Sequence, residues 1–504
     1  MESITLDTIN HYINGQKVKG KSDQVGYVYS PSTGKKIAEV PYATKEEVDE
    51  TVQSAKQAAK KWAKVSIGKR VEVLHRFRHL LVEHTDELAR LIGLENGKTI
   101  SDAKGEIGRG IESVDLAIGA PHILKGEHSV NVGGEINAYS IKQPLGVVTC
   151  ISPFNFPVMV PLAMSTMAVA VGNAMILKPS EKVPYSALYI SDLWEQAGLP
   201  AGIWNVVNGD KDTVQEIITH KDIKAISFVG SSKVAEIIYE TGTKHHKRVN
   251  AFGGGKNHMV VMPDADLDKA VDSFIGAAYG SASQRCMAIS VVMPVGKKTA
   301  EAFTQKLKVK VENLQAGSFD DENADFGAVI SKEAKESILH DIDTALAEGA
   351  NLLVDGRNPD VENTEGFYLG ATLLDQVTPD MKVYREEVFG PARMLVNVET
   401  LDEAIELINE HQYGNGVAIF TNSGRDSRKF THEIEVGMVG VNVPIPIPVG
   451  YYNFGGWKSS RYGEGQMFGP DNARFFTKTK TISERWFDVE DSDELTFDFP
   501  GTKD

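Results

Sequence analysis

The sequence predicts an α/β protein with two doubly wound domains. The chain has 504 residues, more than a single hydrophobic core usually holds. Between residues 146 and 240, short apolar runs rich in β-branched residues alternate with amphipathic segments. A second alternation of this kind extends from about Ile289 to Val443. Alternating strands and helices are typical of a parallel sheet covered by helices, so we expect one such sheet in each region.

Periodicity and turn residues place the elements of the first region. Helices are predicted at residues 45–63 and 68–84, where apolar side chains recur at spacings of three and four. Short apolar runs and helical patterns then alternate, and Gly198-Leu199-Pro200 ends one of the helices. We expect strands at Gly146–Ile151, Ala174–Leu177, Ile203–Val207 and Ala225–Val229, and helices at Pro184–Ala197, 211–219 and Ser232–Glu240, with Ser232 as the cap of the last.

One stretch of the first region has no charged residue. Pro157–Leu177 is long enough to cross a bilayer. Pro157, Pro161, Gly172 and Asn173 interrupt it, so we expect a buried helix followed by a strand instead.

The second region follows the same rules. Its strands include Ile289–Met293 and Val417–Thr421, and its helices include 298–313 and 401–410. A further helix is predicted to start near Asp266 and to end at Gln284-Arg285-Cys286.

The charge balance argues against polyanionic partners. The chain has 53 Lys and Arg against 69 Asp and Glu, a formal net charge of −16, which repels nucleic acid and anionic membranes. Two cysteines, Cys150 and Cys286, do not form the framework of a secreted protein, and the first residues lack the pattern of a signal peptide. We therefore expect a soluble, cytoplasmic protein with no metal site and no nucleic-acid or membrane partner.

A rigid turn follows the first strand of the predicted sheet. In Ser152-Pro153-Phe154-Asn155-Phe156-Pro157, two prolines and two aromatic residues surround one asparagine. Ligands gather at the carboxyl ends of such strands, and a fixed amide can donate to a developing oxyanion. The alternative is an ordinary proline-rich turn.

Two later strand ends offer groups that suit a nucleotide. Lys178 and Glu181 in Lys178-Pro179-Ser180-Glu181 could bind ribose hydroxyls, although they could equally be a solvated pair before a helix. Gly230-Ser231-Ser232 lies between a strand and a helix, where backbone N–H groups suit a phosphate. Many turns carry these residues for backbone reasons alone, and no Gly-x-Gly-x-x-Gly fingerprint follows a predicted strand.

Cys286 is a candidate nucleophile. A lone cysteine is often only a small buried hydrophobe. The adjacent Arg285 favours the thiolate, because a neighbouring cation lowers the pKa of a thiol. No partner histidine can be inferred from position, so a protease-like pair is not indicated.

In this order, the segments SPFNFP, LKPSE, FVGSS, GGGKNHMVVMPDADLD, QRCMA and EEVFGP resemble the aldehyde dehydrogenase superfamily along nearly the whole chain. The segments KNHMVVMPDADLD, QRCMAIS and VGVNVPIPIPVGYYNFGGWKSS are most similar to its CoA-acylating subgroup, which acts on malonate or methylmalonate semialdehyde. Hydrolytic members carry a glutamate that activates water where this chain has Phe252, and the semialdehyde subgroup is also apolar there.

The resemblance implies a role for each matching residue. Cys286 is expected to be the nucleophile, and Asn155 to hold the oxyanion with the backbone N–H of Cys286. Arg109 and Arg285 are expected to bind the substrate carboxylate. The residues expected to bind NAD are Ser152, Phe154, Lys178, Glu181, Lys182, Gly230, Ser231, Phe252, Gly253, Glu387 and Phe389, with Glu387 and Phe389 at the nicotinamide ribose and ring.

The resemblance also implies the domain plan and the reaction. We expect an NAD domain at 1–122 and 145–254, a catalytic domain at 255–448, a small β oligomerisation element at 123–144 and 472–487, and an acidic tail at 488–504. The expected enzyme is a homodimer or homotetramer that uses NAD and coenzyme A and forms propionyl-CoA or acetyl-CoA with loss of the carboxylate. The alternatives are a hydrolytic dehydrogenase of another semialdehyde, such as succinate semialdehyde, and a relative without activity that serves as a binding protein.

Overall fold

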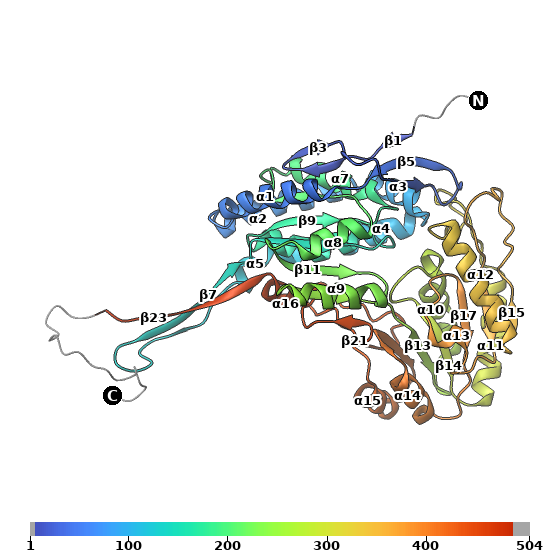
Figure 1. Cartoon of the computed structure of the whole chain (residues 1–504). Helices are drawn as coiled ribbons and strands as arrows, with labels where there is room; N and C mark the ends of the chain where they lie inside the picture. The colour runs from blue at the N-terminus through green and yellow to red at the C-terminus, as the bar shows by residue number, and fades with distance from the viewer. Residues whose placement is uncertain (1–5, 487–504) are drawn as a thin grey trace.

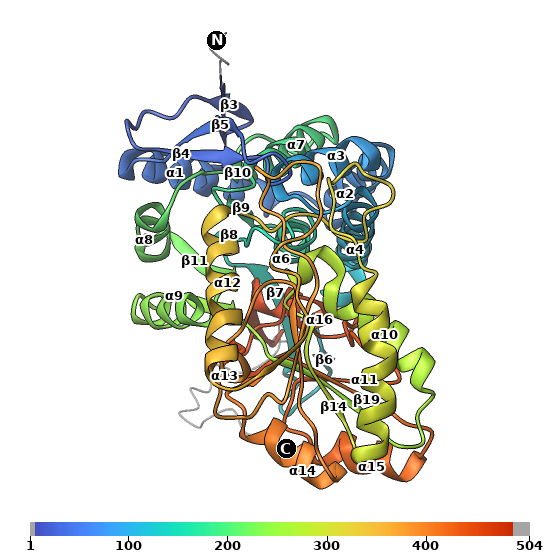
Figure 2. The ribbon, with the colours of Figure 1, turned by 90° about the vertical axis from the view of Figure 1, so that its right-hand side faces the viewer.

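Two large sheets, each covered by helices, form the body of the protein (Figure 1). The computed structural model describes residues 6–486, so the predicted acidic tail lies outside the described residues. Figure 2 shows α8 and α9 on one face of the first sheet and α4 and α6 on the other. The same view shows the second sheet between α12 and the pair α10 and α11. The predicted α/β class with two doubly wound domains is confirmed.

The first sheet has eight strands in the order β22-β12-β11-β8-β9-β10-β2-β3. Its central strands are parallel, with β8 in the middle, β9 and β10 on one side, and β11 and β12 on the other. The strand order therefore reverses between β8 and β11, and ligands bind at such a switch point. The central strands are β8 (Val147–Ile151), β9 (Ala174–Lys178), β10 (Trp204–Val206), β11 (Ile223–Val229) and β12 (Arg248–Phe252).

The helices of the first domain agree with the predicted periodicity. Thr44 and Glu47 form a capping box at the start of α1, and all twelve residues of α6 are buried, as expected for the uncharged stretch. The N-cap of α9 is Ser231 rather than Ser232, and that helix continues to Lys244. The helices are α1 (Lys45–Trp62), α2 (Ile67–Glu83), α3 (Thr85–Asn96), α4 (Ile100–Ile118), α5 (Ala120–Ile123), α6 (Met159–Ala170), α7 (Pro184–Gln196), α8 (Lys211–Thr219) and α9 (Ser232–Lys244).

The edges of the first sheet are antiparallel, which periodicity does not predict. Two edge strands come from the N-terminus, and the other returns after the second sheet to pair with β12. These strands have two or three residues each, too few to show a period. They are β2 (His11–Ile13), β3 (Gln16–Val18) and β22 (Arg461–Tyr462); a separate small sheet holds β1 (Asp7–Thr8), β4 (Val25–Tyr29) and β5 (Lys36–Pro41).

The second sheet has seven strands in the order β15-β16-β17-β14-β13-β19-β20, and all neighbours are parallel except β15 and β16. Its strands are β13 (Asn257–Val261), β14 (Ile289–Pro294), β15 (Asn351–Val354), β16 (Thr372–Asp375), β17 (Ala392–Leu395), β19 (Gly416–Phe420) and β20 (Met438–Val441). Its helices are α10 (Leu267–Tyr279), α11 (Lys297–Glu312), α12 (Lys332–Ala347), α13 (Lys382–Arg385), α14 (Leu401–Glu410) and α15 (Gly424–Glu433), and β18 (Tyr413–Gly414) pairs with β21 (Trp457–Lys458) beside it.

A three-stranded sheet forms an arm that projects from the first domain (Figure 1). It contains β6 (His128–Ser129), β7 (Asn137–Pro144) and β23 (Thr477–Glu484), and α16 (Gly469–Phe475) leads into β23. Strands from both predicted segments, 123–144 and 472–487, thus meet in one small sheet, while its role in assembly stays a prediction. Within residues 6–486, no helix is long and apolar enough to span a membrane.

Candidate active site

A cavity of about 380 Å³ lies between the carboxyl ends of the first sheet and the amino ends of strands in the second. Side chains from α4, from the turns after β8 and β12, and from the segment before β14 line it. Six residues predicted from the sequence meet at its wall: Arg109, Asn155, Phe252, Gly253, Arg285 and Cys286. Each domain therefore contributes part of one site.

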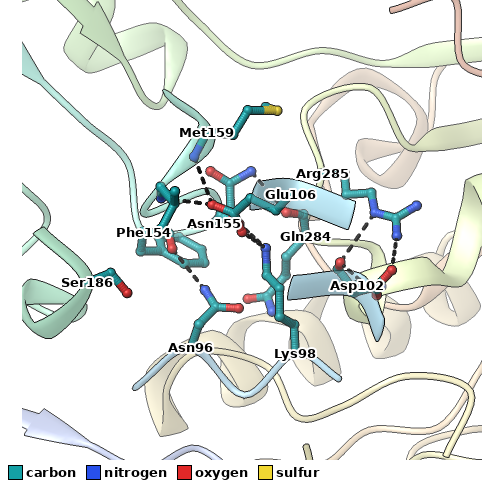
Figure 3. A network of polar contacts seen from close by, with 12 residues as sticks. Asn96, Lys98, Asp102, Glu106, Phe154, Asn155, Met159, Ser186, Gln284 and Arg285 are labelled. Atoms are coloured by element: carbon teal, nitrogen blue, oxygen red, sulfur yellow. Dashed lines mark hydrogen bonds and ion pairs between the residues drawn. The ribbon is translucent and has the colours of Figure 1, made fainter. Parts of the chain in front are cut away.

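Hydrogen bonds hold both the side chain of Asn155 and the backbone around it. Its side-chain amide donates to the carbonyl of Gln284 at 2.9 Å, which joins the turn after β8 to the cysteine segment (Figure 3). Asn96 donates to the carbonyl of Phe154 at 2.8 Å, and Lys98 donates to the carbonyl of Asn155 at 2.7 Å. One hydrogen of the Asn155 amide remains for a ligand in the cavity.

A buried ion pair lies behind this turn. The Lys98 ammonium is 2.7 Å from a Glu106 carboxylate oxygen, and their side chains are 2% and 0% exposed. The other Glu106 oxygen accepts from the backbone N–H groups of Val158 and Met159 at the start of α6 (Figure 3). Carboxylates are favourable at a helix N-terminus, where backbone N–H groups lack partners. The pair thereby holds the segment between Asn155 and Met159. Lys98 binds the carbonyl of Asn155, and Glu106 binds the start of α6.

Cys286 follows a left-handed turn instead of ending a helix. The predicted helix stops at Tyr279, and Ser281, Ala282 and Ser283 have φ angles of 54°, 50° and 61°. Non-glycine residues in this region cost about 1–3 kcal/mol each and persist only where the surroundings hold them. The carboxylate of Asp102 accepts from the Ser281 N–H at 2.9 Å and from its hydroxyl at 3.0 Å.

The Cys286 side chain lies at the cavity, and polar contacts fix its backbone. Asn257 and Asn415 donate to its carbonyl at 2.9 and 3.0 Å. The backbone N–H groups of Cys286 and Met287 act on the sulfur and lower the pKa of the thiol. Those same N–H groups suit an oxyanion formed next to the sulfur.

The expected pKa effect of Arg285 on Cys286 is wrong. Burial, followed by the charge of Glu387, raises the pKa of the thiol to about 12, which outweighs the two backbone N–H groups. Arg285 does not act on the sulfur, because its guanidinium donates to Asp102 at 2.6 Å instead. These surroundings therefore favour the protonated thiol over the thiolate.

Glu387 and Phe389 lie in a loop that is bound to the glycine-rich strand end. Glu387 accepts from the Gly255 N–H at 3.1 Å, and burial raises the pKa of its carboxyl to about 6. Lys256 donates to the carbonyls of Val383 and Glu386, and burial lowers its pKa to about 7. The ring of Phe389 meets that of Phe154 edge to face, with centroids 5.9 Å apart.

The remaining predicted cofactor residues lie along the carboxyl edge of the first sheet. Lys178 and Glu181 form a 3.3 Å ion pair after β9, and Lys182 follows in the same loop. Gly230 follows β11, and Ser231 is exposed at the start of α9 without a side-chain capping bond. The hydroxyl of Ser152 is buried and has no hydrogen-bond partner within the described part of the chain. An unpaired buried hydroxyl and a free helix N-terminus on one edge fit a dinucleotide.

Both predicted carboxylate-binding arginines line the cavity, and each already has a partner. Arg109 donates to Glu112 and to the carbonyl of Pro448, both at 2.6 Å. Arg285 donates to Asp102. Both guanidiniums therefore lie at the cavity, and each forms an ion pair within the chain. Arg109 pairs with Glu112, and Arg285 pairs with Asp102.

Sequence reasoning missed four residues that build this site: Asn96, Lys98, Asp102 and Glu106. Their partners are 52 or more residues away in the chain, apart from the Lys98–Glu106 pair, so spacing does not reveal them. One signal was available. Asp102, Glu106 and Arg109 recur at spacings of four and three and therefore share one face of α4.

A thiol, an amide donor and a dinucleotide-compatible sheet edge around one cavity are the groups that a nicotinamide-dependent oxidoreductase with a reactive cysteine would need. The model of the aldehyde dehydrogenase family matches residues 18–482. The chain belongs to the aldehyde dehydrogenase family.

Relatives and solved structures cover nearly the whole chain. The malonate-semialdehyde dehydrogenase of Pseudomonas aeruginosa is 49% identical over 98% of this chain and 100% of its own length. That of Bacillus pumilus is 43% identical over 96% of this chain and 100% of its own. The methylmalonate-semialdehyde dehydrogenase structure from Oceanimonas doudoroffii has a TM-score of 0.95 and 48% identity, with 96% and 99% covered. A Sinorhizobium meliloti structure complexed with NAD has a TM-score of 0.96 and 47% identity, with 97% and 100% covered.

Proposed function

We propose that this enzyme catalyses the NAD-dependent, CoA-acylating oxidation of malonate or methylmalonate semialdehyde. One observation carries the proposal: Cys286, Asn155 and two arginines share a cavity that has Phe252 where a water-activating glutamate would be. The names of the relatives from Pseudomonas aeruginosa and Oceanimonas doudoroffii support the substrate class.

The cysteine begins the reaction. Sγ of Cys286 loses its proton to solvent and attacks the aldehyde carbon as the thiolate. The carbonyl oxygen becomes an oxyanion that accepts from the free Asn155 amide hydrogen and the Cys286 N–H. NAD, when bound, supplies the hydride acceptor that turns the hemithioacetal into a thioester on Cys286. Because burial and the charge of Glu387 raise the pKa of the thiol, bound ligands that change these surroundings would favour the thiolate.

The residues along the sheet edge would hold NAD. Glu181, with Lys178 beside it, would accept hydroxyls of the adenosine ribose, and its charge would repel a 2′-phosphate, which favours NAD over NADP. Glu387 and Phe389 would hold the nicotinamide ribose and ring. The residues that would hold the phosphates and the remaining parts are Ser152, Phe154, Lys182, Gly230, Ser231, Phe252 and Gly253.

The substrate carboxylate binds between the two arginines. A guanidinium binds a carboxylate through parallel N–H donors, and both Arg109 and Arg285 retain N–H groups beyond those given to protein acceptors. The bond from the carboxylate to the α-carbon then breaks, its electron pair is protonated at that carbon, and carbon dioxide leaves, which water can convert to bicarbonate. Malonate semialdehyde gives acetyl-CoA, and methylmalonate semialdehyde gives propionyl-CoA.

Acyl transfer depends on the side chain at position 252. Phe252 is buried, its ring meets Phe454 edge to face at 5.7 Å, and it has no basic atom. Water at the thioester therefore lacks an activating carboxylate there, and the thiol of coenzyme A takes the acyl group. Malonate semialdehyde plus NAD and coenzyme A yields acetyl-CoA, carbon dioxide and NADH.

The arm and the cysteines support the remaining parts of the proposal. The strands β6, β7 and β23 are mostly half-buried or exposed, and a small sheet with so little core gains stability from a partner subunit. We therefore place the contacts of a homodimer or homotetramer on segments 123–144 and 472–487. Cys150 and Cys286 are both free thiols, which supports a cytoplasmic location.

Product analysis tests the proposed function. Purified enzyme is incubated with NAD and each semialdehyde, with and without coenzyme A, and acyl-CoA, free acid and NADH are quantified. Acetyl-CoA or propionyl-CoA equal to NADH supports the proposal. Free acid at the same rate without coenzyme A would support a hydrolytic dehydrogenase instead, and no NADH with any aldehyde would support a binding protein.

A further inference from the structure

Asp102 places a negative charge at the wall of the substrate cavity. It lies in the first turn of α4, and its side chain is 22% exposed, as is that of Arg285. One carboxylate oxygen accepts from Nη2 of Arg285 at 2.6 Å (Figure 3). The other oxygen accepts from the N–H and the hydroxyl of Ser281. One carboxylate from the first domain thus contacts both the arginine beside the nucleophile and the left-handed turn before it.

Arg285 has no other charged partner within residues 6–486. Its remaining contacts go to the Ser281 hydroxyl and the Gly276 carbonyl, both at 3.3 Å. The short contact to Asp102 therefore sets the orientation of the guanidinium when no substrate is present. A substrate carboxylate that reaches Arg285 from the cavity must therefore bind close to the negative charge of Asp102.

We propose that Asp102 is a specificity-determining residue, an internal counter-ion that holds Arg285 toward the cavity and limits its affinity for the substrate carboxylate. This inference rests on the proposed function, in which Arg285 binds that carboxylate. A limited affinity suits a reaction in which the carboxylate is expelled, because a strongly held anion would resist the loss of its charge.

Asp102→Asn separates the two contacts of the carboxylate. The amide oxygen still accepts from Ser281, so the left-handed turn keeps its support. The amide nitrogen cannot accept from Arg285, so the counter-ion is lost and one further N–H group is free for the ligand. Removal of a like charge about 6 Å from the bound carboxylate should tighten anion binding about threefold or more, even with water-like screening.

The test measures binding of an unreactive anion. Propanal serves as the variable substrate and 3-hydroxypropanoate as the competitive inhibitor, with NADH as the readout. For Asp102→Asn we expect the inhibition constant to fall about threefold or more, with a much smaller change in the KM for propanal. Asp115→Asn is the matched control, since Asp115 lies on the same helix, pairs with Arg78 and does not line the cavity. An unchanged or weaker inhibitor, or an equal change for propanal, would overturn the proposal.

Two further variants remove the structural explanation. In an Arg285→Leu background only the through-space repulsion by Asp102 remains, so Asp102→Asn should tighten the inhibitor less than it does with Arg285 present. An equal gain would show that Asp102 does not act through Arg285. Asp102→Ser, which keeps a hydroxyl for Ser281, repeats the comparison if the first variant does not fold. Failure of both to fold would overturn the proposal by making the carboxylate a requirement of the fold. The proposed function fails separately, when wild-type enzyme forms no acyl-CoA from either semialdehyde.

Discussion

Replacement of Lys98 by methionine should destabilise the protein and displace Asn155. The substitution leaves the Glu106 carboxylate buried without its counter-charge and removes the donor to the Asn155 carbonyl. Loss of one partner of a buried pair costs about 3–5 kcal/mol. Because removal of an oxyanion donor lowers kcat about 10²–10³-fold, a displaced Asn155 should lower the hydride-transfer rate by up to that factor.

A double substitution tests whether the loss comes from the unpaired charge. In Lys98→Met/Glu106→Gln, the glutamine oxygen can still accept from Val158 and Met159, and no charge is left buried. The double variant should therefore recover part of the stability lost in the single variant.

Unfolding midpoints in urea and single-turnover NADH formation measure the two effects. Lys104→Met is the control, since Lys104 lies on α4 with Glu106 and forms an exposed pair with Asp86 that should contribute less than about 1 kcal/mol. If the double variant is as unstable as Lys98→Met, or if Lys98→Met equals the control, the ion pair does not support the site as argued.

Three further results are expected. Cys286→Ala should abolish turnover but still bind NAD in a fluorescence titration, whereas Cys150→Ala should remain active because Cys150 is fully buried in β8. A Cys150→Ala variant that folds and binds NAD but is inactive would contradict this assignment. Arg109→Leu and Arg285→Leu should each reduce kcat/KM for semialdehydes by about 2–4 kcal/mol of transition-state stabilisation and affect propanal much less; equal losses on both substrates would assign the arginines to the fold. Glu387→Gln should shift the pH profile of iodoacetamide labelling of Cys286 to lower pH in the absence of cofactor. The reason is that the Glu387 charge raises the pKa of the thiol, and labelling requires the thiolate. An unchanged profile would show that Glu387 does not raise the pKa of Cys286.

Local patterns predicted most of the regular structure. The strands β8, β9, β11 and β14 were expected within a few residues because buried parallel strands are continuous apolar runs. The end of α10 was missed because Ser281-Ala282-Ser283 contains neither glycine nor proline, and its left-handed backbone depends on an aspartate from another domain. The edge strands were missed because each has only two or three residues, and because β2 and β22 pair with the sheet across more than 190 residues.

The site was only partly predictable for the same reason. Strand ends, short motifs and the resemblance predicted that Asn155, Cys286 and both arginines belong to the site. All four line one cavity. The Lys98 contact behind Asn155 joins segments that are distant in the sequence, so no motif reports it. The pKa argument failed because it rested on adjacency in the sequence. Arg285 directly precedes Cys286, but its guanidinium pairs with Asp102.

The central claim is that acyl transfer from Cys286 waits for coenzyme A. Stopped-flow absorbance should record NADH formation from enzyme, NAD and malonate semialdehyde without coenzyme A. The account predicts a burst of about one NADH per active site followed by a stall, which is the signature of an accumulated acyl-enzyme. Addition of coenzyme A should restart NADH formation. Linear NADH formation without coenzyme A, at the rate seen with it, would contradict the account, because water would then release the acyl group without a base at position 252.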